Sequence, residues 1–393
     1  MRRRLVLLTG LSLVSYVLRT NISVSAKLMM PELGVDEVQM GRVFSAFLVG
    51  YALFQVPAGA LGDRFGPRSV LTVAAGVWGL LTLLTGLVPA GSVVLAWLIV
   101  LRFVLGAAQA ATYPVAARAV RSWVQSSERA FANSLVIAGL PLGSALTPPA
   151  ISFLMVTLGW RASFYLTGVL GLAMAIVWWL FAPPPLGSKD PSPPRSSVEW
   201  APLLRNRNLL LVSMSYFFEG YVFFMFVFWL YLYFVDQKGF GILSGGLVAS
   251  LPWLVALVLT PLGGALCDRL AERRGRLAAG RTVVVPAYLA AGGLLFVGTA
   301  TDHRYLAVAV LSLSVGCLMS AEGAFWSSAA HLAGGQTGTG SGVMNMAGIL
   351  GGVVSTSVVP VLAEAFSWRI ALGSGTLAAA ACAGTWLFIR EDR

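Results

Sequence analysis

Residues 5–26 read LVLLTGLSLVSYVLRTNISVSA, a long apolar run with one arginine, Arg19, inside it. Four polar residues of this run fall on one face at helical spacing: Ser12, Tyr16, Arg19 and Ser23. An arginine at the centre of a membrane-spanning helix costs roughly 2.5–3.5 kcal/mol on insertion scales, and it usually faces a partner or a water-filled cavity. We therefore expect a cavity beside this stripe. The alternatives are that Arg19 reaches toward a lipid headgroup or forms a structural ion pair.

The composition places the whole chain in a lipid bilayer. Of its 393 residues 57% are hydrophobic and 11% are charged, and the mean hydropathy is +0.80. A hydrocarbon core of about 30 Å needs roughly 20 residues per helix. Twelve apolar stretches of that length occur, centred near residues 15, 50, 80, 105, 143, 172, 221, 257, 291, 318, 351 and 379. The sequence predicts an all-α membrane protein with twelve transmembrane helices and almost no soluble domain.

The net charge of +11 does not indicate a nucleic-acid partner, because the basic residues are scattered singly through short loops. The distribution of these basic residues between the two sides of a membrane explains the positive charge better. If the N-terminus is cytoplasmic, most of the 27 Lys and Arg residues lie in cytoplasmic segments. Those on the far side are then Lys27, Arg42, Arg161, Lys238, Arg304 and Arg369. This asymmetry predicts a multi-pass protein of the cell inner membrane with both termini in the cytoplasm.

A dense group of glycines and charges, GALGDRFGPR at residues 59–68, ends the second apolar stretch. A strand before such glycines would suggest a phosphate loop, but two spanning helices flank them here. We expect a tight cytoplasmic turn, in which glycines allow close backbone approach and Asp63 faces the positive end of a neighbouring helix. The predicted residues of this conformational motif are Gly59, Gly62, Asp63, Arg64, Gly66 and Arg68.

The same pattern returns in the second half as GALCDRLAERRG at residues 264–275, with Asp268 and Arg269 in the places of Asp63 and Arg64. A second echo, Gly-Trp-Arg at 159–161 and Ser-Trp-Arg at 367–369, recurs at nearly the same separation. Two matches at one offset indicate a duplicated six-helix unit.

The duplication predicts two six-helix bundles, residues 1–182 and residues 207–393. Residues 183–206, between them, are rich in proline, serine and charge, which is typical of a cytoplasmic linker.

Four charged side chains lie well inside the apolar stretches, in the first, fourth, seventh and tenth expected helices: Arg19, Arg102, Glu219 and Glu322. If each bundle is itself two three-helix repeats, these are the first helices of all four repeats. Charges that line a central pathway are expected on equivalent helices of the repeats, as these four are. The alternative is that they form Arg–Glu pairs that hold the bundles together. In the fourth expected helix Arg102 shares one face with Gly106, Gln109 and Tyr113.

Residues 59–68 and the stretch RFVLG at 102–106 resemble two motifs of the major facilitator superfamily, and the resemblance covers essentially the whole chain. It implies the major facilitator fold and, as in most members, a monomer. Further stretches are similar to the anion:cation symporter family, which includes sugar-acid transporters, sialin and the vesicular glutamate transporters. These are YVLRTN at 16–21, FSAF at 44–47, GY at 50–51, QVPAG at 55–59, Trp229, SLP at 250–252, Asn345 and GG at 351–352.

This resemblance implies that Arg19 engages a substrate carboxylate, with Asn345, Trp326 and Tyr51 near the bound ligand. One departure concerns proton coupling. Proton-coupled members carry an acidic residue just before the first-helix arginine and a glutamate seven residues after the fourth-helix arginine, where this chain has Leu18 and Gln109. Three possibilities follow: Glu322 or Glu219 has taken over, the protein is a uniporter or exchanger, or the substrate is not a simple anion.

We therefore expect a secondary active transporter that moves a small organic anion, such as a carboxylate or sugar acid, by alternating access. The expected substrate-binding residues are Arg19, Tyr16, Tyr51, Arg102, Gln109, Trp326 and Asn345, and those for proton coupling or gating are Glu219 and Glu322. A guanidinium suits a carboxylate because its planar fork donates two parallel hydrogen bonds.

The alternative is an exporter or antiporter of amphipathic or cationic metabolites, with the two glutamates as cation sites and the aromatic residues 221–234 as an adaptable wall. An enzyme or receptor is disfavoured, because no nucleophile, base and oxyanion arrangement is apparent. Three cysteines, an odd number within or near helices, indicate neither disulfides nor a metal site. We expect no cofactor and no metal.

Overall fold

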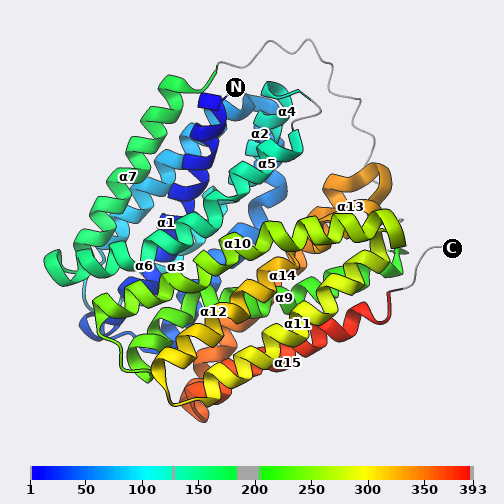
Figure 1. Ribbon diagram of the computed structural model, residues 1–393. Coiled ribbons are helices and arrows are strands. Elements are labelled where there is room, and N and C mark those ends of the chain that lie inside the picture. Colours follow the sequence, from blue (N-terminus) through cyan, green and yellow to red (C-terminus); the bar gives the residue numbers. More distant parts are fainter. Residues whose placement is uncertain (1, 126–128, 184–202, 204, 390–393) are drawn as a thin grey trace. The chain divides into compact units, whose positions relative to one another are not determined.

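The protein is built from helices (Figure 1). The computed structural model describes residues 2–125, 129–183, 203 and 205–389, and no strand occurs within these ranges. The all-α prediction is confirmed. The chain divides into two compact units, Met1–Pro191 with Phe240–Ser250, and Ser192–Gly239 with Leu251–Arg393. Most of the predicted linker, residues 183–206, lies outside the described residues.

The first unit contains seven labelled helices and the start of an eighth. They are α1 (Arg2–Leu33), α2 (Glu37–Gly86), α3 (Val94–Gln109), α4 (Thr112–Trp123), α5 (Arg129–Ile137), α6 (Gly139–Leu158), α7 (Trp160–Phe181) and the first residues of α10 (Ile242–Arg274). Ser250 on α10 donates a hydrogen bond to the carbonyl of Ala145 at 2.6 Å, which ties this start to α6.

The second unit contains the rest of α10 and the remaining helices. They are α9 (Arg207–Leu232), the π-helix η2 (Tyr233–Gln237), α11 (Arg276–Ala300), α12 (Arg304–Ser320), α13 (Glu322–Ala333), the short 3-10 helix η3 (Gly334–Gln336), α14 (Thr337–Ala365) and α15 (Trp368–Trp386).

Ten helices among the described residues are long and apolar enough to cross a membrane. One of them, α2, has 50 residues and would be about 75 Å long at 1.5 Å per residue, more than two crossings of a core of about 30 Å. It is interrupted at Gly66, where φ is 79° and ψ is 159°. Helix α15, with 19 residues, is not among the ten. The count of twelve crossings and the cytoplasmic termini stay predictions.

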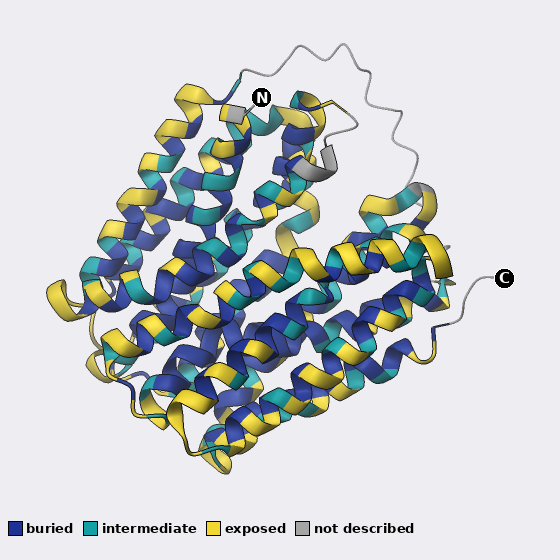
Figure 2. Ribbon diagram, viewed as in Figure 1, coloured by how far each residue is buried: buried dark blue, intermediate teal, exposed yellow. Residues whose placement is uncertain are grey.

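The helices present apolar side chains outward, as lipid contact requires. Exposed positions recur along their lengths (Figure 2), and on α7 they include Leu170, Ile176 and Leu180. A soluble protein rarely exposes contiguous apolar surface on this scale. The polar side chains that could not be solvated in lipid are turned inward, where Arg19, Arg102 and Glu219 are all buried.

The same helix pairing occurs in both units. In the first, α1 packs on α6, α2 on α3 and α4, and the second half of α2 on α7. In the second, α9 packs on α14, α10 on α12 and α13, and α11 on α15. The two units therefore repeat one arrangement, as expected for a duplicated unit.

Close backbone approach makes two of these pairings possible. A Cβ atom built on Gly106 of α3 would lie 2.0 Å from the carbonyl oxygen of Phe47 on α2. In the second unit a Cβ atom on Gly220 of α9 would lie 1.8 Å from the carbonyl oxygen of Gly348 on α14. Only glycine allows backbones to meet at these distances, a device common in membrane helix pairs.

The two echoes seen in the sequence mark equivalent turns. Gly66 lies between the halves of α2 with φ of 79°, and Gly275 lies between α10 and α11 with φ of 84°. Positive φ is a conformation that glycine adopts at little cost. The echo at 159–161 opens α7, and the echo at 367–369 opens α15.

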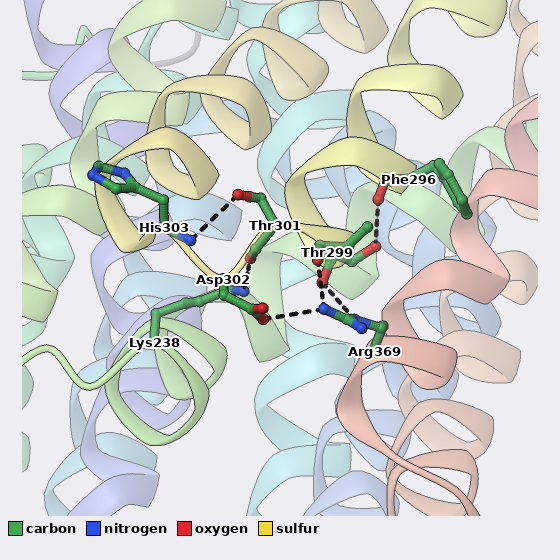
Figure 3. A network of polar contacts seen from close by, with 8 residues as sticks. Lys238, Phe296, Thr299, Thr301, Asp302, His303 and Arg369 are labelled. Atoms are coloured by element: carbon green, nitrogen blue, oxygen red, sulfur yellow. Dashed lines mark hydrogen bonds and ion pairs between the residues drawn. The ribbon is translucent and has the colours of Figure 1, made fainter.

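The arginines of the second echo bind the ends of neighbouring helices. Arg369 donates to the carbonyl oxygens of Thr299, at 3.2 Å, and of Ala300 at the end of α11, and pairs with Asp302 at 3.1 Å (Figure 3). Lys238 donates to the next carbonyl, that of Thr301, at 2.6 Å. Burial lowers the pKa of Lys238, although Asp302 acts in the opposite direction.

In the first unit Arg161 does the same for the end of α2. It donates to the carbonyl oxygens of Gly86 at 2.9 Å and Val88 at 3.1 Å, and pairs with Glu32 at 3.1 Å. The last carbonyls of a helix have no partner within the helix and carry partial negative charge, so a guanidinium stabilises them.

The capping is reciprocal at the opposite ends of the same helices. Arg68, at the start of the second half of α2, donates to the carbonyl oxygen of Trp179 near the end of α7 at 3.0 and 2.6 Å. Arg281, near the start of α11, donates to the carbonyl oxygens of Trp386, at 3.2 Å, and Ile389. Each unit therefore holds one helix pair together by arginines at both ends.

We expect Gly220→Ala to lower the melting temperature in detergent. The new methyl group must displace the α14 backbone, and such overpacking costs roughly 1–3 kcal/mol. Gly293→Ala, on α11, is the matched control because its Cβ would enter open space, and glycine is the poorer helix former there. A melting temperature for Gly220→Ala at or above that of Gly293→Ala would contradict the close α9–α14 approach.

Candidate functional site

Arg19 lies in the interior of the first unit with 3% of its surface exposed. Its Nε donates to Oε1 of Gln109 at 3.2 Å, and its Nη1 donates to the hydroxyl of Tyr16 at 3.1 Å. Nη2 is buried and makes no hydrogen bond with any residue that the structure describes. The guanidinium is therefore neutralised by no carboxylate among these residues and keeps an unused donor.

Three aromatic rings surround this guanidinium. Its Cζ lies 4.4 Å from the ring centroid of Tyr16, 4.7 Å from that of Tyr51 and 5.0 Å from that of Phe47. Cation–π contacts at these distances stabilise a desolvated cation by up to about 2 kcal/mol each. They hold the positive charge in place without neutralising it, so an anion still gains from binding there.

Gln109 is placed by a break in its helix. Helix α3 ends at Gln109 and α4 begins at Thr112, because Pro114 has no N–H to continue the hydrogen-bond ladder. At this break the Gln109 amide also donates to the carbonyl oxygen of Ser15 at 3.0 Å. One side chain thus joins Arg19 to the backbone of α1.

Arg102 lies apart from the hydrogen bonds of Arg19. It is 1% exposed, and its Nε, Nη1 and Nη2 atoms have no hydrogen-bond partner among the described residues. Its Cζ lies 5.8 Å from the ring centroid of Phe164 on α7. The structure therefore shows a second buried guanidinium with unused donors, and it gives Arg102 no hydrogen bond in common with Arg19.

A second polar cluster lies in the other unit, around Glu322. The hydroxyl of Tyr216 and the indole Nε1 of Trp326 both donate to Oε1 of Glu322, at 2.7 and 2.6 Å. Glu219, one turn along α9 from Tyr216, is 4% exposed. Its carboxyl group is close enough to Glu322 for electrostatic interaction. The two predicted coupling residues are therefore neighbours within the second unit.

The helix that carries Glu322 is also broken at this residue. Helix α12 ends at Ser320 and α13 begins at Glu322, so the carboxyl group lies in the first turn of α13. Interrupted helices are typical of ligand sites at mid-membrane depth, because the break frees backbone groups and helix ends. One long span of each unit, Val94–Trp123 in the first and Arg304–Ala333 in the second, is thus interrupted beside a polar residue, at Gln109 and at Glu322.

The predicted conformational motif lies at the turn within α2. Asp63 forms an ion pair with Arg118 of α4, and a Cβ on Gly62 would lie 2.7 Å from Val115 of α4. Arg64 lies over the ring of Phe65. In the second unit Asp268 pairs with Arg276 across the turn at 2.7 Å, and Arg269 is exposed. The first copy is joined to α4 by an ion pair, and the second copy approaches α13, where a Cβ on Gly323 would lie 3.1 Å from Cα of Gly264.

The structure groups the predicted substrate residues unevenly. Arg19, Tyr16, Tyr51 and Gln109 form one cluster, Trp326 joins Glu322, and Asn345 lies half-buried on α14. Sequence reasoning missed Arg118, Phe47, Tyr216 and Tyr288. Tyr216 could have been found, because it lies three residues before Glu219 and so shares its helical face.

No group of three or more His, Cys, Asp or Glu side chains in the described part of the chain is arranged to hold a metal ion. The clusters can instead bind charge through arginine donors and carboxyl oxygens. A guanidinium with an unused buried donor suits an oxyanion. A buried carboxyl pair suits a proton or another cation.

Comparison with known proteins identifies a matching family and several relatives that are transporters. The family model of the Major Facilitator Superfamily matches residues 8–356. A probable sulfoacetate transporter, SauU, of Cupriavidus necator is 34% identical over 370 residues, which cover 89% of this chain and 84% of that protein. A probable galactarate/D-glucarate transporter, GarP, of Escherichia coli strain K12 is 29% identical and covers 96% of this chain and 92% of its own length.

Among solved structures, the fold resembles a bacterial homologue of the human lysosomal transporter Spinster in an inward-facing and occupied conformation. The TM-score is 0.77, and the match covers 98% of this chain and 96% of that one. At 17% sequence identity this likeness concerns the fold alone.

We expect Arg102→Met to raise the melting temperature of the purified protein. Methionine fills the space of the aliphatic stem but removes a buried cation without partners, which costs several kcal/mol to desolvate. Arg42→Met, at an exposed position of α2, serves as the control and should change the melting temperature little. A clear decrease for Arg102→Met would show that its guanidinium is paired in the folded protein.

Proposed function

The chain belongs to the major facilitator superfamily, and we propose that it is a secondary transporter that carries a small organic anion across the cell inner membrane by alternating access. In this proposal the substrate passes unchanged, so no catalytic residue and no cofactor take part. The protein works as a monomer with both termini in the cytoplasm, as two six-helix bundles joined by residues 183–206.

One observation carries the substrate class. The Arg19 guanidinium is buried, is paired with no carboxylate among the described residues, and keeps its Nη2 donor unused. An anion supplies both the missing acceptor and the missing negative charge. Gln109 and Tyr16 fix the orientation of the guanidinium through Nε and Nη1, so binding requires little ordering of this side chain.

The relatives support the same class. Their names refer to sulfoacetate, hexuronate and galactarate or glucarate, all small organic acids. A carboxylate and a sulfonate both present oxygen atoms that a planar guanidinium can bind through two donors. Tyr51 and Phe47 complete the wall of this site. Arg102, Trp326 and Asn345 stay predicted substrate contacts.

The proposal is tested by uptake of radiolabelled sulfoacetate, D-glucuronate and D-glucarate into proteoliposomes. Arg19→Lys should lower uptake of the accepted anion about 10- to 100-fold, because a hydrogen bond to a charged group contributes roughly 1.5–3 kcal/mol. Arg42→Lys keeps an exposed charge of the same unit and should behave as wild type. Near-normal uptake by Arg19→Lys would argue against direct recognition by Arg19.

We expect Gln109→Glu to make anion uptake depend on pH. The new carboxylate would lie beside Nε of Arg19 and, when ionised, would compete with the substrate for the guanidinium. Its KM should therefore rise from pH 5.5 to pH 8 more steeply than that of wild type. Gln109→Leu is the neutral control, and an equal pH response in both variants would mean that residue 109 does not control access to Arg19.

A further inference from the structure

We propose that the coupling proton of this transporter is carried by Glu219, with Glu322 held beside it as a carboxylate. The inference rests on the proposed anion transport and assigns its coupling site to the second unit. Beside Arg19 lie Leu18, its neighbour in the chain, and Gln109, which accepts from its Nε, and neither side chain can exchange a proton.

The contacts of Glu322 match an ionised carboxyl group. One of its oxygens accepts two hydrogen bonds, from the hydroxyl of Tyr216 and from Nε1 of Trp326. The residue also lies in the first turn of α13, where unpaired backbone N–H groups attract negative charge. Two donors and a helix N-terminus together fix Glu322 as an acceptor.

Glu219 has none of these contacts. Its side chain is 4% exposed, and no ion pair joins it to a basic residue of the described chain. Its one carboxylate neighbour is Glu322. Two negative charges in one largely buried site repel each other, and a proton on Glu219 removes the repulsion.

A separate observation points to the same place. The hydroxyl of Tyr288 on α11 is fully buried and has no hydrogen-bond partner among the described residues, although it interacts electrostatically with both Glu219 and Glu322. A buried hydroxyl without a partner is costly. The Tyr288 hydroxyl can donate a hydrogen bond to Glu219 when Glu219 is a carboxylate. It can accept a hydrogen bond from Glu219 when Glu219 is protonated.

Four titratable groups interact electrostatically with Glu219, and α14, which also packs on α9, contributes none of them. They are Tyr216 on α9 itself, Tyr288 on α11, Glu322 on α13 and Cys382 on α15. No arginine, lysine or histidine of the described chain pairs with either carboxyl group. A metal cation would need several more oxygen ligands than these residues offer, whereas a proton needs one acceptor.

The step is a simple proton transfer. A proton from the side of higher proton concentration forms an O–H bond with a carboxylate oxygen of Glu219, which becomes neutral. The same bond breaks when the site faces the opposite side, and the proton leaves to water there. Because this proton transfer accompanies the transport cycle in the proposal, a proton gradient drives the anion.

The first test needs no substrate. Infrared difference spectra of the purified protein between acid and alkaline buffers should show the C=O stretch of a protonated carboxyl group in a dry environment. We expect this band to vanish in Glu219→Gln and to remain in Glu322→Gln and in Glu364→Gln, an exposed control on α14. A band lost in Glu322→Gln but kept in Glu219→Gln, or no band in wild type, overturns the assignment.

The second test uses proteoliposomes and the anion found by the uptake panel. An inward proton gradient should stimulate uptake by wild type and by Glu364→Gln but not by Glu219→Gln, whose folding is checked by its melting temperature. Stimulation retained in Glu219→Gln, or stimulation by a sodium gradient instead, contradicts the proton site. Failure of all anion uptake would overturn the proposed function. The infrared spectra would still decide whether Glu219 is the carboxyl group that binds the proton.

Discussion

A charge inside a membrane protein has to be matched, because neither lipid nor a dry interior can solvate it. Of the four charges inside the apolar stretches, Arg19, Arg102 and Glu219 are buried and Glu322 is half-buried, and they meet that constraint to different degrees. Arg19 is surrounded by aromatic rings and two hydrogen-bond acceptors, and Glu322 by two donors and a helix N-terminus. The Arg102 guanidinium has no hydrogen-bond partner among the described residues and lies 5.8 Å from the ring centroid of Phe164, and Glu219 has another carboxyl group, that of Glu322, as its neighbour. Much of the internal structure follows from holding these groups.

The sequence predicted the parts that depend on local pattern. The turns at Gly66 and Gly275 follow from glycine-rich motifs, and the helical content follows from the hydropathy of the whole chain. The face shared by Tyr16 and Arg19 also follows from helical spacing, and the structure joins these two side chains by a hydrogen bond.

Other features depend on contacts between distant segments and could not be predicted. The Arg118–Asp63 pair joins α4 to a turn of α2, and the Tyr216–Glu322 bond joins α9 to α13. The interruptions beside Gln109 and Glu322 were also missed, because a single proline or glycine in an apolar stretch does not by itself break a membrane helix. Arg102 was expected on a common site with Arg19, but the two share no hydrogen bond.

The interruption of one long span in each unit, beside Gln109 and beside Glu322, has an evolutionary consequence. After a gene duplicates within itself, both copies inherit the same weak point in the same helix, and each can acquire a different residue there. In this chain one copy has a neutral amide beside a guanidinium and the other has an acid beside a tyrosine and a tryptophan. Under the roles proposed for Arg19 and Glu219, selection can alter what is carried by changing one copy while the coupling site in the other copy is preserved.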